Sequence, residues 1–317
     1  MSKPNMGAMF GGESMGGLFD IPFAKPGDVD GADIVVMGAP VATSYKTVGA
    51  YCADAPKTIR HGFGWPGVGE HFDFDLDGKL LGERAYAVDW GDLECSFDDY
   101  QYNRRLIKEN VKTVLDAGAV PVVLGGDDSI PIPVLQAYED HGPVTILQLD
   151  AHIDWRDEVQ AEKMGLSSNM RRASEMAWVE NIIQVGARGA GSARPSDVAD
   201  AREWGVKFFS MKKMRSTDIK TSIDLVVEAI PHDSRVYIAL DIDVMDPSVV
   251  PGVIGPAPGG FGYYEILSIL ELVAEKSQLS GFNLAEFMPS ADAGNRGALL
   301  CARLTASVMG LIARQRS

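Results

Sequence analysis

Acidic side chains gather in three short motifs, and each motif directly follows a run of apolar residues. The motifs are LGGDDS (124–129), DAHID (150–154) and ALDIDVMDP (239–247). Carboxylates crowded together raise each other's pKa unless cations neutralise them. One such motif would also fit the helix caps and turns that Asp commonly forms, but three favour a different role. Oxygen-rich motifs with one imidazole indicate a site for divalent metal ions such as Mn²⁺.

The spacing within two of these motifs places the potential ligands on a common face. Asp150, His152 and Asp154 occur at every second residue, and so do Asp241 and Asp243. In an extended segment, residues at this spacing point to the same side. We therefore expect each set to face one site at the end of its strand.

The apolar runs themselves predict β-strands that are buried on both faces. Several are continuous and β-branched rather than alternating, which is typical of parallel sheets. They span residues 33–39, 85–89, 120–124, 144–149, 182–185, 206–209, 236–240 and 282–286. Helices are predicted between them at 102–117, 132–138, 195–204, 218–229, 263–275 and 298–314.

This alternation predicts a three-layer α/β/α fold with a mainly parallel central sheet of about eight strands. Right-handed crossovers would bring most strand carboxyl ends to one edge, where the acidic motifs would meet. No repeat or linker follows residue 31, so one domain is expected over residues 32–317. Residues 1–31 are rich in Met and Gly and form an N-terminal arm. The arm is either a flexible tail or a segment that packs on a neighbouring subunit or over the site.

Composition excludes several classes of protein. The chain has 317 residues with 29 Lys and Arg against 44 Asp and Glu, so its net charge of −15 argues against nucleic-acid binding. The three cysteines form no paired pattern and indicate reduced thiols in a cytoplasmic protein. No apolar run is expected to reach the roughly 20 residues of a membrane helix, and no signal peptide is evident.

The three motifs resemble those of the ureohydrolase family, which includes arginases and agmatinases. The family patterns are GGDHS, DAHxD and SxDxDxxDP, and the resemblance extends over about residues 32–314, including LAEFMP (284–289). It implies the arginase-type fold, a small cationic guanidino substrate and a homo-oligomer, either a trimer or a hexamer. It also implies two divalent ions, first of all Mn²⁺, with Ni²⁺ or another divalent ion as the alternative.

The resemblance also assigns roles to individual residues. A metal-bridging hydroxide would attack the guanidinium carbon and release urea and an amine. Asp154 would orient this hydroxide and pass a proton to the leaving amine, and Glu286 would accept N–H bonds from the guanidinium group. The implied metal ligands are Asp128, Asp150, His152, Asp154, Asp241 and Asp243.

The sequence departs from the family pattern at two histidines. Asp128 stands where GGDHS has its histidine; it either reaches the same metal or turns away, so that one metal is lost. The family's proton-shuttling histidine before an Arg-Arg-Ala run is also missing. Ser167 and Ser168 lie there instead and are candidates for substrate hydrogen bonds, although neither can carry a proton as an imidazole does.

Two arginine segments are further candidates. Arg156 either pairs with a substrate carboxylate or with its neighbours Asp157 and Glu158. The loop 188–194 has an arginine at each end and either binds an anionic substrate tail, contacts an oligomer partner or is structural.

The first hypothesis is therefore an agmatinase-like hydrolase of a linear guanidino compound. Related substrates remain open: guanidinobutyrate, guanidinopropionate, free guanidine or a formimino compound. A hypothesis of another class is a non-catalytic partner subunit that retains the fold. Metal content separates the two classes, because a silent subunit would bind well under two ions per chain.

Overall fold

The computed structural model describes residues 17–64, 67–191 and 193–316. Eight strands form one sheet in the order β2-β1-β3-β8-β7-β4-β5-β6, and every neighbouring pair is parallel. The eight predicted strands and the fold class are thus confirmed. The strands are β1 (Ile34–Ala39), β2 (Ala87–Asp92), β3 (Val120–Gly125), β4 (Val144–Leu149), β5 (Val179–Val185), β6 (Lys207–Phe209), β7 (Arg235–Asp241) and β8 (Gln278–Ala285).

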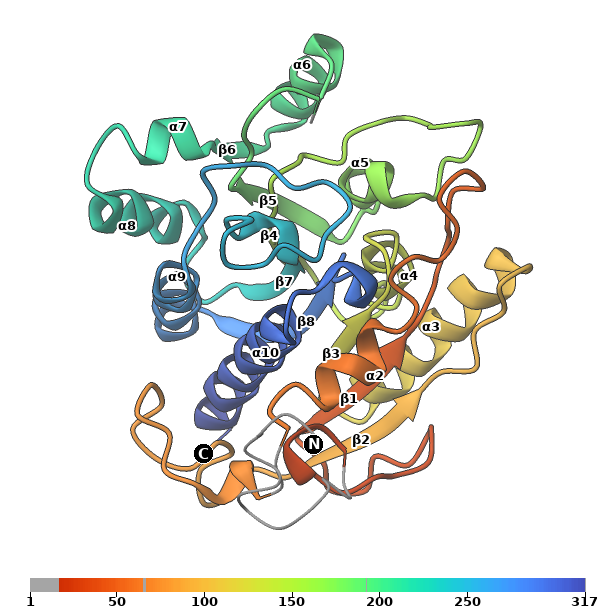
Figure 1. Ribbon diagram of the computed structural model, residues 1–317, viewed down its shortest axis with the longest axis vertical. Coiled ribbons are helices and arrows are strands. Elements are labelled where there is room, and N and C mark those ends of the chain that lie inside the picture. Colours follow the sequence, from red (N-terminus) through yellow and green to blue (C-terminus); the bar gives the residue numbers. More distant parts are fainter. Residues whose placement is uncertain (1–16, 65–66, 192, 317) are drawn as a thin grey trace.

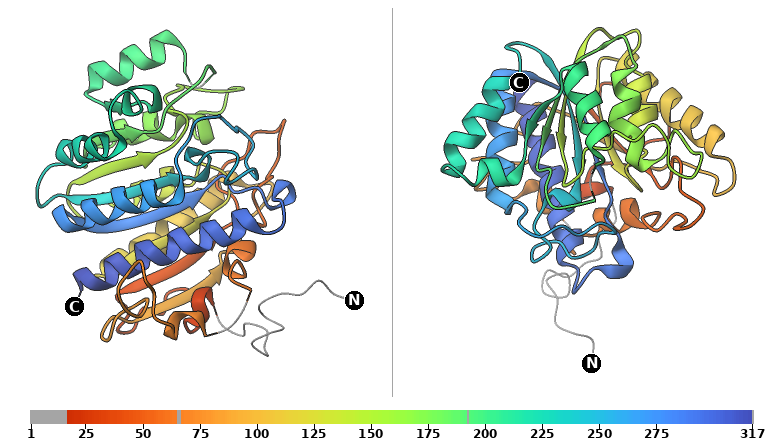
Figure 2. Two further views of the ribbon diagram at one scale, coloured as in Figure 1. Left: turned by 60° about the vertical axis from the view of Figure 1, so that its left-hand side comes forward. Right: turned by 90° about the horizontal axis from the view of Figure 1, so that it is seen from above.

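Helices cover both faces of this sheet, as Figures 1 and 2 show. One layer packs against the apolar cluster built around β7 and β8 and contains α2 (Ala55–Arg60), α7 (Met211–Met214), α8 (Ile219–Ala229), α9 (Tyr263–Lys276) and α10 (Arg296–Gln315). The other layer contains α3 (Tyr100–Asp116), α4 (Pro131–Gln136), α5 (Asn169–Ser174) and α6 (Pro195–Trp204). The six predicted helices are confirmed within a few residues. The sequence missed α2, α5 and α7, because helices of four to six residues show too little periodicity.

Five short 3-10 helices complete the described elements. They are η1 (Leu18–Asp20), η2 (Val68–Glu70), η3 (Leu166–Ser168), η4 (Ile242–Val244) and η5 (Pro289–Ala291).

Helix α10 is long and apolar enough to cross a membrane by length and composition alone. The expectation that no segment reaches that threshold was wrong for this helix. However, 72% of its apolar window is buried inside the fold, where it packs against α9, α2 and β8. Burial of this kind is typical of a core helix, so the composition of α10 is weak evidence for a membrane span.

The described part of the N-terminal arm packs on its own domain. Leu18, Phe19 and Ile21 are buried, and the Leu18 N–H donates to Asp89 Oδ2 over 2.9 Å. Residues 1–16 lie outside the described part of the chain, so the predicted behaviour of the arm as a whole stays a prediction.

A buried ion pair fastens this segment and α2 to the sheet. Asp89 is fully buried and accepts two hydrogen bonds from Arg60, at 2.8 and 3.0 Å. We expect Asp89→Ala to lower the free energy of unfolding by about 3 kcal/mol, because the buried Arg60 guanidinium loses its main counter-charge. Urea denaturation followed by circular dichroism measures this. The exposed pair of Lys79 and Glu70 provides the control, since Glu70→Gln should change stability little.

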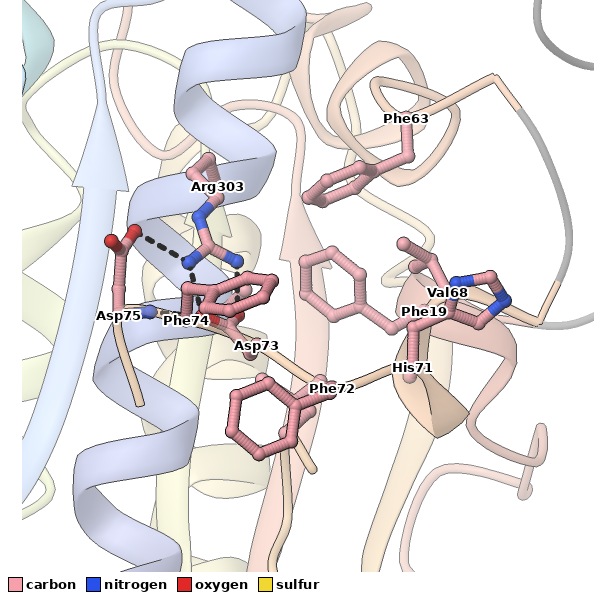
Figure 3. A pocket seen from close by; sticks show the side chains of 12 residues that line it. Phe19, Phe63, Val68, His71, Phe72, Asp73, Phe74, Asp75 and Arg303 are labelled. Carbon is pink, nitrogen blue, oxygen red and sulfur yellow. Dashed lines mark hydrogen bonds and ion pairs between the residues drawn. The ribbon is translucent and has the colours of Figure 1, made fainter. Parts of the chain in front are cut away.

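A second ionic cluster ties α10 to the loop after η2 (Figure 3). Arg303 donates to both Asp73 and Asp75 beside a pocket of about 350 Å³ that Phe19 also lines. His71 lines this same pocket and is absent from the residues that line the acidic cavity described below. His71 is therefore no candidate ligand for the acidic motifs.

Candidate metal centre

Four adjacent central strands deliver the acidic motifs to one edge of the sheet. The strands β3, β8, β7 and β4 are neighbours, and Asp128, Glu286, Asp241 and Asp150 lie at or just after their carboxyl ends. Crevices at the carboxyl ends of parallel strands are the common location of ligand sites in α/β sheets. The strand order therefore explains why residues up to 158 positions apart meet.

The side chains form two groups of potential metal ligands that share one residue. One group contains Asp150, His152, Asp241 and Asp243, and the other contains Asp128, Asp150 and Asp154. Within each group the ligand atoms lie within 4.8 Å of one another. All six predicted ligands are thus brought together, and Asp128 does not turn away from them.

The DAHID motif contributes ligands to both groups, but its backbone is bent and not extended as expected. β4 ends at Leu149, and residues 150–154 form an irregular turn in which Asp154 has φ +45°. Because of this turn, His152 belongs to one ligand group and Asp154 to the other, while Asp150 serves both. The three residues thus meet at one site as expected, but through a bent segment rather than an extended one. A left-handed conformation of a non-glycine residue is sparsely populated, and such residues concentrate at functional sites.

Two buried amide side chains hold the carboxylates in place. Gln148 Nε2 donates to Asp150 Oδ2 at 2.6 Å and to Asp154 Oδ2 at 3.1 Å. Asn169 Nδ2 donates to Asp128 Oδ2 and to Asp154 Oδ2. Amide donors compensate part of the negative charge and orient the carboxylate oxygens. The sequence analysis missed both residues, although a polar Gln inside the apolar run VTILQL was an available signal.

The electrostatics of the cluster fit cations rather than an isolated acidic site. Burial raises the pKa of Asp128, Asp154, Asp241 and Asp243, and neighbouring carboxylates raise them further. Burial lowers the pKa of His152, but hydrogen bonds to Asp150 and Asp243 outweigh it and raise the value to about 12.

One carboxylate oxygen of the cluster is left without a partner. Asp128 is 2% exposed, and its Oδ1 has no hydrogen-bond donor among the described residues. Leaving a buried carboxylate oxygen unpaired is costly, and a bound divalent cation removes this cost. The donor set therefore fits a pair of divalent ions.

Glu286 faces the same cavity from the end of β8. The Tyr51 hydroxyl donates to both of its carboxylate oxygens at 2.8 Å, and the Asp128 N–H donates to Oε1 at 2.8 Å. Burial and the charge of Asp127 raise its pKa to about 8. Glu286 itself has φ +67°, a second left-handed residue at the site. Tyr51 was not identified from the sequence, because it lies in a loop with no recognisable motif.

The cavity has a volume of about 410 Å³ and is lined by both ligand groups and by substrate candidates. Its buried part contains the aspartates and Glu286, and its outer part contains Arg194, Ile254 and Gly255. Such a volume is within the range of small-molecule sites.

The predicted substrate-binding residues differ in their placement. Ser167 lines the cavity, but Ser168 is fully buried and does not, because the 3-10 helix η3 turns it away. Arg156 lines the cavity and pairs with Asp197 at 2.7 Å, so the alternative in which it pairs with Asp157 or Glu158 was wrong.

The two arginines at the ends of the loop 188–194 have different surroundings. Arg188 donates to the backbone carbonyls of Asp243, Met245 and Ala257, so it is structural. Arg194, at the other end of the loop, lines the cavity.

The central strands of the parallel sheet bring two overlapping ligand groups into one cavity, one with a histidine and one of carboxylates alone, and this arrangement is typical of metal-dependent hydrolases. The profile of the arginase family matches residues 32–310, and the chain belongs to that family. Members of the family are binuclear metal-dependent amidinohydrolases that act on C–N bonds other than peptide bonds.

Several relatives cover nearly the whole chain. It is 29% identical over 298 residues to proclavaminate amidinohydrolase of Streptomyces clavuligerus, covering 90% of this chain and 89% of that protein. A solved structure of proclavaminate amidinohydrolase from the same organism matches with a TM-score of 0.83 at 27% identity, covering 95% of this chain and 98% of that chain.

Two further relatives have different names. One is agmatinase of Pyrococcus horikoshii, 29% identical and covering 90% and 94% of the two chains. The other is formimidoylglutamase of Halobacterium salinarum, 30% identical and covering 93% and 92%. These three relatives have different names but similar identity to this chain, so the comparisons alone do not identify its substrate.

Proposed function

We propose that this protein hydrolyses a linear guanidino compound to urea and an amine. The observation that carries the proposal is the cavity in which two ligand groups sharing Asp150 face Glu286. We further propose Asp128, Asp150, His152, Asp154, Asp241 and Asp243 as the metal ligands and Mn²⁺ as the first candidate ion.

The roles of the protein side chains follow from their chemistry. When bound, two divalent ions lower the pKa of coordinated water and supply a nucleophile near neutral pH. Glu286 accepts N–H bonds from the planar guanidinium group and so holds it in the cavity. Asp154 accepts a proton and returns it to the leaving amine, since a carboxylate held in the buried cluster is suited to general acid–base work. Tyr51 orients Glu286 through its two hydrogen bonds.

Retention of both ligand groups argues against a non-catalytic partner subunit. The test is a urea-release assay over a panel of guanidino compounds with Mn²⁺, Ni²⁺, Zn²⁺ and Co²⁺, together with metal analysis. Turnover with about two ions per chain supports the proposal. Folded protein that binds well under two ions and releases no urea would instead identify a silent subunit.

Two substrates are favoured by different observations. Agmatine is favoured by the likeness to agmatinase, and its cationic tail suits the net charge of −15. 4-Guanidinobutyrate is favoured by Arg156 and Arg194, which line the same cavity as Glu286. Arginine is well suited to bind a carboxylate tail.

Because the two compounds differ in their terminal group, a comparison of kcat/KM values separates them. If the tail is a carboxylate, Arg194→Gln should lower kcat/KM for guanidinobutyrate by about 10-fold and leave agmatine nearly unchanged. Arg202→Gln is the matched control, since Arg202 lies on the last turn of the same helix and is exposed. A higher kcat/KM for agmatine, unaffected by Arg194→Gln, would exclude the carboxylate tail.

A further inference from the structure

The two ligand groups offer different donor atoms. The group of Asp150, His152, Asp241 and Asp243 contains an imidazole nitrogen, whereas the group of Asp128, Asp150 and Asp154 consists of carboxylates alone. They share Asp150, so a difference in metal preference between them must come from the unshared residues.

The described chain offers no nitrogen or sulfur ligand to the carboxylate group. His152 Nδ1 lies 2.9 Å from Asp243 Oδ2 and 3.4 Å from Asp150 Oδ1, which commits this ring to the other group. The remaining histidines lie elsewhere: His141 contacts Asp116, His232 contacts Asp233, His61 caps α2 and His71 lines the pocket of Figure 3. None of the cysteines is part of either group.

Asp128 supplies the open oxygen of the carboxylate group. Its Oδ2 accepts a hydrogen bond from Asn169, but its Oδ1 is buried and has no partner among the residues described. One oxygen of Asp128 lies within 4.8 Å of Asp150 and Asp154 ligand atoms, and a buried carboxylate that keeps an unpartnered oxygen in this cluster is suited to bind a cation. Asn169 anchors this arrangement, because it also donates to the Asp128 carbonyl at 2.6 Å and to Asp154 at 3.2 Å.

We propose that the metal centre is chemically asymmetric. Asp128 makes one of its two metal positions an all-oxygen site, and this position prefers the later transition metals over Mn²⁺ less strongly than the histidine-containing position does. Imidazole suits Ni²⁺, Zn²⁺ and Co²⁺, whereas carboxylates suit Mn²⁺ and Mg²⁺. The histidine-containing position therefore retains a stronger preference for the later transition metals. This proposal rests on the two-metal site of the proposed function and adds to it an origin for metal selectivity.

Two variants at Asp128 separate the type of donor from its charge. Asp128→His introduces an imidazole and removes one negative charge, while Asp128→Asn removes the charge and retains an oxygen donor. The loss of charge weakens binding of every divalent ion. The ratio of the Ni²⁺ affinity to the Mn²⁺ affinity therefore reports the effect of the donor atom separately from the effect of charge.

The experiment is a titration of chelator-treated full-length protein with Mn²⁺ and with Ni²⁺. Calorimetry gives the two affinities, metal analysis gives the stoichiometry, and both readouts are independent of turnover. We expect two ions per chain in the wild type. Asp128→His should raise the Ni²⁺-to-Mn²⁺ affinity ratio at one position by about 10-fold, and Asp128→Asn should leave this ratio near its wild-type value.

Three results would overturn the proposal: an unchanged ratio in Asp128→His, an equal rise in Asp128→Asn, or one ion per wild-type chain. Urea release measured on the same preparations separates this failure from that of the proposed function. Hydrolysis with an unchanged ratio rejects the asymmetry alone, whereas protein that neither binds ions nor hydrolyses any guanidino compound rejects both.

Discussion

Alanine at Asp154 or at Asp243 should lower urea release by about 10³-fold or more. Asp154 belongs to the carboxylate group and Asp243 to the histidine-containing group, so each substitution damages a different half of the metal centre. Asp243 also contacts the His152 ring at 2.9 Å and accepts the Ala151 N–H at 3.0 Å. Loss of either carboxylate removes a donor that the metal-dependent nucleophile requires.

The assay is steady-state urea release by purified protein, with circular dichroism to establish that each variant is folded. Asp157→Ala is the matched control, because Asp157 lies three residues beyond Asp154 on the surface and pairs with Arg172 and Lys163. It should retain wild-type activity. A folded Asp154→Ala or Asp243→Ala protein with near wild-type turnover would refute the two-metal assignment.

Glu286→Gln should lower kcat/KM by about 10- to 150-fold, which corresponds to roughly 1.5–3 kcal/mol for a lost charge-assisted hydrogen bond. The substitution retains the shape of the side chain and an oxygen that can accept the Asp128 N–H bond. It removes the charge that would pair with the guanidinium group, so catalysis should suffer more than folding.

The control for this prediction changes the same charge at an exposed position. Glu158→Gln should leave kcat/KM unchanged, because Glu158 is exposed and does not line the cavity. Thermal unfolding of both variants checks stability. Equal kcat/KM values for Glu286→Gln and the wild type would show that Glu286 is not the guanidinium partner.

The sequence predicted most of the architecture, because strands buried on both faces leave a strong local signal. Runs such as VTILQL and VYIAL are mostly apolar and do not alternate with charged residues, and all eight runs became strands of one parallel sheet. Short helices such as α5 left no such signal and were missed, since one to two turns cannot establish a period.

The ligand types were also evident from the sequence, since three acidic motifs after three strands are difficult to explain without cations. The way in which these ligands divide between the two groups was not evident from the sequence. An extended DAHID would place Asp150, His152 and Asp154 together, but the left-handed turn at Asp154 sends it to the other group. Backbone conformation of this kind is determined by surrounding contacts, here with Gln148 and Asn169, rather than by residue spacing.

The amino-acid sequence by itself thus determined the fold class, the strand ends and the acidic residues that meet there, because hydrophobic pattern and residue type are local properties. Tertiary structure alone decided which partners surround each residue. Tyr51 reaches Glu286 across 235 positions and Arg156 pairs with Asp197 rather than with its sequence neighbours. These contacts depend on the order of strands in the sheet and on loop paths, which are set by the packing of the whole domain.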